Sequence, residues 1–263
     1  MKFSVIINCY NTLPIIRRCI EAVIESTDGH SEIILVNNHP PYPEVLAYLS
    51  QFHHPRVQIL DPGQNLSHVL GTQFAAQHAR GQYLIRMDDD CVVPRNNWAA
   101  AMAQALNHFR DLAYIGLPWP GIPLSGAQRA SAPGITIEYA DFVLFTCVMF
   151  RRQLWQAHFI LPAQGIYGDD DSAAAQKAAA LGLRRAYLVS HPCQHIGRTA
   201  ECDSLYGAWK LLYHRKRTAL DFAAWRRNVS EINPEEAALL GNFGYSEPQI
   251  EEIKTLIAKL VRA

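Results

Sequence analysis

Apolar runs that end in polar side chains alternate with segments of helical periodicity along the first part of the chain. Residues 3–11, FSVIINCYN, form a continuous run rich in β-branched residues, which is typical of a strand buried on both faces. Residues 13–26, LPIIRRCIEAVIES, then carry apolar residues at the spacing of an amphipathic helix. The same succession continues, with strands predicted at 31–40, 57–61 and 81–90 and helices predicted at 43–52, 66–79 and 94–109.

This alternation predicts an α/β fold with a mainly parallel sheet flanked by helices, because strands that alternate with helices are joined by right-handed crossovers. In such a sheet the carboxyl ends of the strands line the crevice that binds ligands. Three polar clusters fall at those ends, at residues 8–11, 37–38 and 88–90. We therefore expect these clusters to converge on one edge of the sheet.

The remainder of the chain predicts less regular structure. Residues 116–134 are rich in glycine and proline and predict a loop over the sheet edge, either a flexible surface loop or a lid on an acceptor site. Residues 140–155 return to a buried strand followed by the start of a helix. From about residue 200 onward the pattern predicts helices joined by short breaks. We therefore divide the chain into a domain of residues 1–200 and a small helical C-terminal extension of residues 201–263.

Composition and charge narrow the class of protein. The 263 residues are 49% hydrophobic, and 24 Lys and Arg balance 24 Asp and Glu, which argues against non-specific nucleic-acid binding. The six cysteines form no CxxC pair, which favours a reducing cytosol. The N-terminal apolar run is too short for a signal peptide, and the run at 142–150 is too short to span a bilayer. We predict a cytoplasmic protein, with the inner face of a membrane as an alternative location.

Two triple-aspartate clusters carry the candidate chemistry. Asp88, Asp89 and Asp90 follow an apolar strand, and three adjacent like charges there must be solvated or neutralised. Mg²⁺ or Mn²⁺ would do this, because such cations take oxygen ligands and bind carboxylates together with substrate phosphates. The second cluster, residues 169–171, opens an alanine-rich helix. Capping of that helix is its alternative interpretation, since an acid in the first turn accepts free N–H groups.

Five segments together resemble glycosyltransferase family 2. They are SVIINCYN, EIILVNN, NLSHVLGTQFAAQHARGQYLIRMDDDCVVP, GDDDSAAAQKAAALGL and SHPCQHIG. The resemblance covers roughly residues 1–200. It implies a GT-A fold, a nucleotide-sugar donor such as a UDP-sugar, a divalent cation, and inversion at the anomeric carbon of the transferred sugar.

The resemblance also implies roles at the donor site. Asn8 and Tyr10 match positions that contact the donor nucleoside, and Asn38 matches a position that contacts the base. Asp88 and Asp90 match the DxD motif, with Asp89 between them also assigned to the nucleotide sugar. Asp90 is the strongest candidate for a metal ligand. Because Asn37 and Asn38 replace the acids that are frequent in the family, the identity of the nucleotide stays open.

A late histidine and the acidic helix complete the site that the resemblance implies. His195 matches a histidine that approaches the metal, and its distance from Gly182 fits the family better than that of His191. A surface-loop histidine is the alternative interpretation of His195. The catalytic base matches either Asp170, which the preceding Gly168 favours, or Asp171, which the spacing to Gly182 favours. Asp170 is the slight favourite.

Basic residues and aromatic residues mix in the segment 206–227. A solvated basic helix face is the favoured interpretation, and the alternative is a patch that binds a diphosphate, a lipid-linked acceptor or an anionic membrane through residues 210–227. Nothing in the sequence resembles a nucleic-acid-binding module. The acceptor is expected to be a glycan or a lipid-linked or protein-linked group. The rival functions are a non-catalytic sugar-nucleotide-binding or glycan-binding protein and, less well supported, a nucleotidyltransferase, for which the glycine-rich loop after the first strand is missing.

Overall fold

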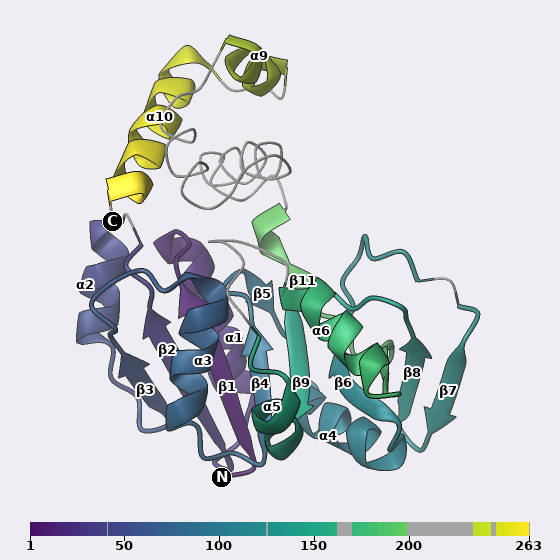
Figure 1. Cartoon of the computed structure of the whole chain (residues 1–263). Coiled ribbons are helices and arrows are strands. Elements are labelled where there is room, and N and C mark those ends of the chain that lie inside the picture. The colour runs from purple at the N-terminus through teal and green to yellow at the C-terminus, as the bar shows by residue number, and fades with distance from the viewer. Residues whose placement is uncertain (41, 125, 162–169, 199–233, 243–245, 263) are drawn as a thin grey trace.

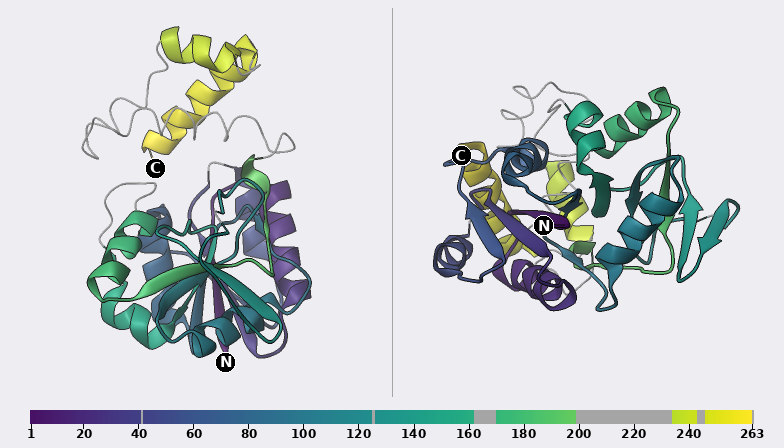
Figure 2. Two further views of the ribbon diagram at one scale, coloured as in Figure 1. Left: turned by 90° about the vertical axis from the view of Figure 1, so that its right-hand side faces the viewer. Right: turned by 90° about the horizontal axis from the view of Figure 1, so that it is seen from below.

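The protein is built on a nine-stranded sheet with helices on both faces (Figures 1 and 2). The computed structural model describes residues 1–40, 42–124, 126–161, 170–198, 234–242 and 246–262. The strand order is β3-β2-β1-β4-β9-β6-β10-β8-β7. These strands are β1 Phe3–Cys9, β2 Ser31–Asn37, β3 Val57–Leu60, β4 Tyr83–Met87, β6 Leu112–Gly116, β7 Arg129–Ala132, β8 Ile135–Tyr139, β9 Cys147–Arg151 and β10 Arg184–Leu188.

The strand directions confirm the expected α/β fold. Parallel pairing joins β3, β2, β1 and β4, and also joins β6 and β10. The strands β8 and β9 are antiparallel to the other strands of the sheet. Strand β9 lies between β4 and β6 and pairs antiparallel with both. The carboxyl ends of β1, β2 and β4 therefore lie side by side, as the sequence predicted.

Helices cover the sheet because their apolar residues recur at helical spacing. In α1, for example, the buried residues Ile15, Ile16, Cys19, Ile20 and Val23 line one face. The helices α1 and α4 contribute to the core on one face of the sheet, and α3, α5 and α6 contribute to the core on the other. The bounds are α1 Leu13–Ser26, α2 Pro43–Gln51, α3 Ser67–His78, α4 Trp98–His108, α5 Arg152–His158 and α6 Asp170–Ala180.

The region predicted as a loop at residues 116–134 contains regular structure. Residues 129–132 form β7, which pairs antiparallel with β8 at the edge of the sheet. The prediction was wrong here because β7, with the sequence RASA, is exposed or half-exposed along its length and carries no apolar pattern. Main-chain pairing with β8 holds these residues in the sheet.

The C-terminal region contains two described helices, α9 Pro234–Asn242 and α10 Glu247–Arg262 (Figure 1). Helical structure in this part of the chain agrees with the sequence pattern. The basic segment 206–227 lies outside the described residues, and the domain boundary at residue 200 stays a prediction. Within the part of the chain that the structure describes, no helix combines the length and the apolar character needed to cross a membrane.

Candidate functional site

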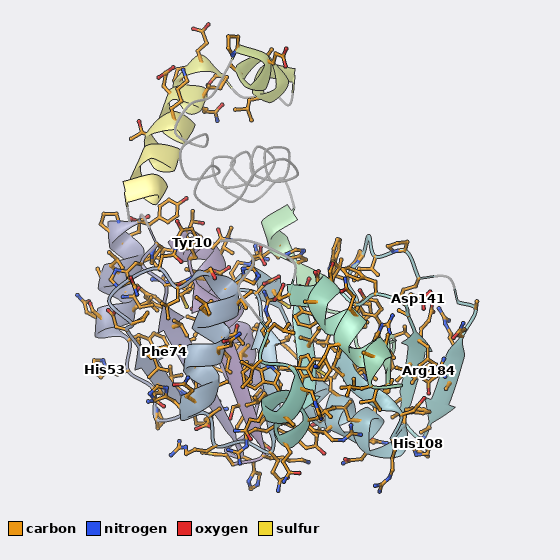
Figure 3. All side chains as sticks on the ribbon, viewed as in Figure 1. Tyr10, His53, Phe74, His108, Asp141 and Arg184 are labelled. Atoms are coloured by element: carbon orange, nitrogen blue, oxygen red, sulfur yellow. The ribbon has the colours of Figure 1, made fainter. Side chains whose placement is uncertain are left out.

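The polar clusters predicted at the strand ends meet at the carboxyl edge of the sheet. The β1–β2 register places Cys9 opposite Asn37, and the β1–β4 register places Ile7 opposite Met87. The residues that follow these strands therefore share one edge. Tyr10, just after β1, marks this edge in the side-chain view (Figure 3).

Asp89 fastens the end of β1 to the end of β4. One oxygen of its buried carboxylate accepts hydrogen bonds from the backbone N–H groups of Tyr10 and Asn11, at 2.6 and 2.7 Å. Charge-assisted bonds of this kind are short and strong. The carboxylate thus holds the turn after β1 in place, and its predicted contact with a nucleotide sugar stays a prediction.

Asp88, Asp90 and His195 form a group that could hold a metal ion. Each offers one ligand atom, and these atoms lie within 4.8 Å of one another. The Nε2 atom of His195 lies 3.0 Å from Oδ1 of Asp90. Two carboxylate oxygens and one imidazole nitrogen are a donor set that suits Mn²⁺, and the nitrogen makes the set less typical of Mg²⁺. The residues present therefore fit the cation that the sequence predicts.

A second, two-stranded sheet brings His195 to this group. Strand β11, Gln194–His195, pairs antiparallel with β5, Cys91–Val92, so that His195 lies opposite Cys91. The chain then passes close over Asp90, whose carbonyl oxygen accepts the N–H of Ile196 at 2.8 Å. A Cβ atom at Gly197 would lie 1.8 Å from the Asp90 carboxylate, so only glycine fits there.

Arg86 is a functional candidate that the sequence interpretation missed. Its buried guanidinium lies between two carboxylates, with Nη1 2.6 Å from Oδ1 of Asp88 and Nη2 3.5 Å from Oδ2 of Asp170. It also donates to the carbonyl oxygen of Phe145. The available signal was an arginine within the otherwise apolar strand YLIRM, because buried arginines are nearly always paired.

Asp170 begins helix α6 and is held from two sides. The Nε2 atom of His68 on α3 lies 3.2 Å from Oδ1, opposite the guanidinium of Arg86. Burial alone would raise the pKa of Asp170, but the charges of Arg86 and His68 outweigh it, and the pKa lies well below its ordinary value. Asp170 is therefore ionised at neutral pH. Asp171 follows it in α6, whereas Asp169 and Gly168 lie outside the described residues.

The amide of Asn8 faces helix α3. Its Nδ2 atom donates to the carbonyl oxygen of His68 at 3.1 Å and to the hydroxyl of Thr72 at 2.9 Å. Helix α3 can approach this closely because residue 71 is glycine, where a Cβ atom would lie 2.3 Å from Oδ1 of Asn8. Asn8 thus positions α3, and with it His68, over the end of β1.

Tyr10 and Asn38 lie beside the loop that leads into α3. Burial raises the pKa of Tyr10, the charge of Tyr42 adds to this, and a hydrogen bond with Asn65 opposes it. The Oδ1 atom of Asn38 accepts the backbone N–H of Leu66 at 2.8 Å. The two residues therefore sit near each other along the same edge, where the sequence predicts nucleoside contacts, and those contacts stay predictions.

Asp61 closes this end of the edge and was not singled out from the sequence. Its carboxylate accepts a bond from Asn37 at 2.9 Å and lies 2.8 Å from Nε2 of His39. The N–H of Gly63 and then His39 lower the pKa of Asp61, although burial opposes them. An aspartate directly after β3 was the signal available. These contacts join the chain after β2 to the chain after β3.

Comparison with known proteins identifies a family match. The family described as Glycosyl transferase family 2 matches residues 4–159, which is more than half of the 263 residues. No curated protein matches this sequence.

Solved structures of glycosyltransferases share the fold. GalNAc-T7 with UDP, GalNAc and Mn²⁺ superposes with a TM-score of 0.64 at 15% identity, over 84% of this chain and 51% of the other. The mannosyltransferase PcManGT from Pyrobaculum calidifontis, with GDP-Man and Mn²⁺, superposes with a TM-score of 0.60 at 15% identity, over 97% of this chain and 84% of the other. S. aureus TarS residues 1–349 with UDP-GlcNAc superposes with a TM-score of 0.55 at 13% identity, over 86% of this chain and 70% of the other. The chain spans about half the length of GalNAc-T7, and at these identities the likeness shows the GT-A fold.

Proposed function

The chain belongs to glycosyltransferase family 2, and from this premise we propose that it transfers a sugar from a nucleotide-diphosphate donor to an acceptor hydroxyl with inversion. The observation that carries the proposal is the group formed by Asp88, Asp90 and His195, at the edge of the sheet where ligands bind in α/β folds. The complexes of similar folds with UDP, UDP-GlcNAc or GDP-Man support a nucleotide-sugar donor. A UDP-sugar is the donor we expect first.

The proposed donor site uses the carboxyl ends of β1, β2 and β4. Asp88, Asp90 and His195 would hold Mn²⁺, which would neutralise the charge that develops on the leaving diphosphate. Asn8, Tyr10 and Asn38 line the part of the edge proposed for the nucleoside. Asp89 keeps the chain after β1 in register with them through its two bonds to backbone N–H groups.

The proposed base is Asp170 at the start of α6. The guanidinium of Arg86 contacts both Asp88 and Asp170. The carboxylate of Asp170 therefore lies one guanidinium away from the proposed metal group and is not part of it. That separation suits a single displacement, in which the sugar lies between the diphosphate and the attacking hydroxyl. Asp170 would take the proton of that hydroxyl and is ionised at neutral pH, although the pairing with Arg86 and His68 that lowers its pKa also makes it a weaker base.

Asp171 is proposed to orient the acceptor. It is adjacent to Asp170 at the N-terminus of α6 and is half-buried. The acceptor itself is proposed to be a glycan or a lipid-linked or protein-linked group, and contact of residues 210–227 with a membrane stays a prediction. These assignments separate proton removal from positioning within one turn of helix.

Nucleotide binding with and without metal tests the proposal. We expect UDP or GDP to bind much more tightly with Mn²⁺ than with EDTA by calorimetry, since a divalent cation binds carboxylates and substrate phosphates together. Asp90→Asn should abolish the difference and keep the melting temperature. A matched surface change, Arg95→Gln, should leave binding unchanged, because this exposed arginine pairs with Glu25 in the last turn of α1 and is not part of the group.

Hydrolysis of the donor distinguishes an enzyme from a binding protein. Metal-dependent release of nucleotide from a panel of UDP-sugars and GDP-mannose is the expected result. Equal affinity with and without chelator, in both the parent protein and Asp90→Asn, would overturn the assignment of the metal group. Metal-dependent binding without any release of nucleotide would instead support the non-catalytic alternative.

A further inference from the structure

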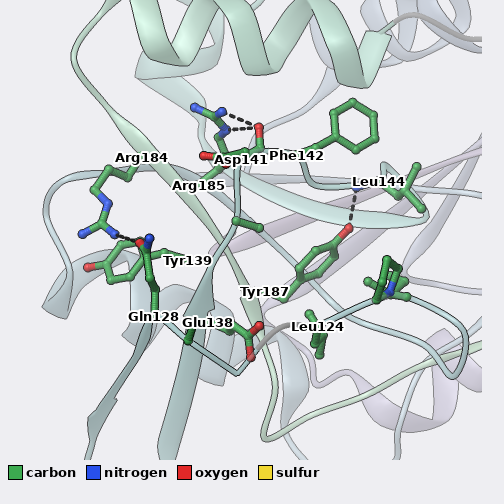
Figure 4. A pocket seen from close by; sticks show the side chains of 14 residues that line it. Leu124, Gln128, Glu138, Tyr139, Asp141, Phe142, Leu144, Arg184, Arg185 and Tyr187 are labelled. Carbon is green, nitrogen blue, oxygen red and sulfur yellow. Dashed lines mark hydrogen bonds between the residues drawn. The ribbon is translucent and has the colours of Figure 1, made fainter.

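A pocket of about 510 Å³ opens on the sheet beyond the proposed metal group (Figure 4). It lies over β8 and β10, and its walls include residues 122–124, 140–142 and 144. Its volume falls in the range of small-molecule sites. Asp141 and Arg184 lie at its outer side, on the part of the molecule away from Tyr10 (Figure 3).

The inner wall of the pocket continues into the proposed active site. Leu144 lines the pocket, and its N–H donates to the hydroxyl of Tyr187 at 2.8 Å (Figure 4). The next residue, Phe145, accepts a bond from Arg86. The residue after that, Thr146, accepts the N–H of Asp88 at 2.9 Å. Three consecutive residues therefore connect the pocket, the bridging arginine and the proposed metal group.

The acidic helix start approaches the same end of the pocket. Burial raises the pKa of Tyr187 to about 12, the N–H of Leu144 opposes this, and the charge of Asp171 adds to the increase. Contacts place the helix start there, because Asp170 lies 3.5 Å from the guanidinium of Arg86, which donates to Phe145, the neighbour of Leu144. A ligand that fills the pocket would extend from Tyr187 and Leu144 toward Arg184.

The lining suits a neutral polar ligand with an apolar face. Two arginines, Arg184 and Arg185, balance two acids, Glu138 and Asp141, so the described lining lacks the surplus of positive charge that a diphosphate would need. The ring of Phe142 is 40% exposed at the pocket, beside these polar groups. A sugar ring offers a matching combination of hydroxyls at its rim and C–H groups on its face.

We propose that this pocket binds the acceptor as a sugar, with the reacting hydroxyl at the end formed by Tyr187 and Leu144 and the rest of the glycan directed toward Arg184. The proposal rests on the proposed function, because it supplies the acceptor for that transfer. It narrows the acceptor class from any hydroxyl compound to a glycan.

Alkylation of an introduced cysteine tests sugar binding without any donor. Ala127→Cys, at an exposed position in the pocket lining that leaves the Phe142 ring in place, is made in a Cys202→Ser background, because the other five cysteines are buried and Cys202 lies outside the described residues. The probes are methyl glycosides of common hexoses and N-acetylhexosamines, and inorganic diphosphate. A bound glycoside at about ten times its Kd should slow the reaction of the thiol at position 127 with iodoacetamide about tenfold, since only free protein reacts. Arg95→Cys, at an exposed position outside the pocket, is the matched control and should not be slowed.

The outcomes separate this proposal from the transferase proposal. Protection of the thiol at position 127 by at least one glycoside, with none at position 95, supports a sugar pocket, and Ala140→Trp should then lower the ratio of glycoside transfer to donor hydrolysis by about tenfold or more. Protection by diphosphate alone, protection at both positions, or no protection by any glycoside overturns it. If a glycoside protects the Ala127→Cys variant but no donor is hydrolysed, the transferase proposal fails while the sugar pocket stands.

Discussion

Buried acids lie at both edges of the parallel strands, but only at the amino edge are their charges matched one for one. There, Glu32 on β2 accepts bonds from the hydroxyl of Ser4 at 2.6 Å and from the N–H of Arg80 at 2.6 Å. The guanidinium of Arg80 adds contacts at 2.8 Å. One carboxylate thus meets one guanidinium, and the protein alone satisfies the pair.

At the carboxyl edge the negative charges outnumber the arginine. Asp88, Asp89, Asp90 and Asp170 gather there around Arg86, with His68 and His195 as further partners. Like charges at this spacing repel one another, and the repulsion is relieved by a cation. The comparison teaches that a balanced acid stabilises the sheet, whereas a surplus of acids leaves negative charge at the edge where we propose that a divalent ion and a diphosphate bind.

The largest expected effect is on turnover at the start of α6. Asp170→Asn should lower kcat by about 10²–10⁴-fold while donor and metal binding persist, because a general base contributes this much to rate. Asp171→Asn should lower kcat less, since we assign it to acceptor orientation. Initial rates and melting temperatures of both variants check this. If both variants turn over normally with donor bound, the acidic helix start only caps the helix.

The next effect is on stability, at Asp89. Asp89→Ala should lower the free energy of unfolding by about 3 kcal/mol, because two buried backbone N–H groups lose a charged acceptor. Glu32→Ala at the amino edge should cost a similar amount and leave Mn²⁺ affinity unchanged. Urea unfolding and Mn²⁺ titration of the two proteins provide the measurement. A fully stable Asp89→Ala would show that the contacts with Tyr10 and Asn11 do not hold the edge together.

A smaller effect is expected from a change at Arg86, which should raise the affinity for Mn²⁺ and lower the rate of turnover. Arg86→Met should bind Mn²⁺ about tenfold more tightly, because a positive charge beside Asp88 is removed, and should turn over about tenfold more slowly, because Asp170 is no longer held. Arg151→Met is the matched control on the adjacent strand. Arg151 donates to the carbonyl oxygens of Leu112 and Leu106, so its loss should affect stability alone. Weaker metal binding in Arg86→Met would favour a purely structural role.

The smallest effect concerns pH at the amino edge. Burial raises the pKa of Glu32, but its bonds to Ser4 and Arg80 outweigh burial and lower the pKa below its usual 4.5. Glu32 therefore contributes stability that is fully present above pH 4.5 and is lost as the pH falls through its lowered pKa. The difference in unfolding free energy between the parent protein and Glu32→Gln should shrink as the pH falls from neutrality to below 4.5, as urea titrations would show. A constant difference would contradict the ionic pairing.

The elements of the N-terminal half could be predicted from sequence because their periodicity is local. A few residues are enough to recognise β1 by its β-branched residues and α1 by its apolar face. Strand β7 could not be predicted, since its pairing with β8 depends on main-chain bonds that leave no apolar pattern in RASA. Some predicted boundaries were also wrong. The strand predicted at 81–90 is β4, Tyr83–Met87, which ends before the aspartates.

The sequence predicted the acidic residues of the candidate site, but it did not predict most of the residues that pair with them. Asp88, Asp90 and His195 stood out through the resemblance, and the structure brings them together. The bridge from Arg86 to Asp170 could not be read from sequence, because it joins residues far apart in the chain through a side chain that pattern analysis assigns to a buried strand. The orientation of Asn8 toward α3 likewise depends on the close approach at Gly71.

Because β11 must pair with β5, the group of Asp88, Asp90 and His195 is completed late in the synthesis of the chain. Asp90 leaves the ribosome long before His195, and chains begin to fold from the N-terminus during synthesis. The nascent chain can therefore build β1 to β4 and expose its aspartates, but the proposed set of three metal ligands is complete only after β11 has emerged. An ion held as we propose would bind fully only after His195 has been made, and a product terminated before His195 would carry the acids without the histidine.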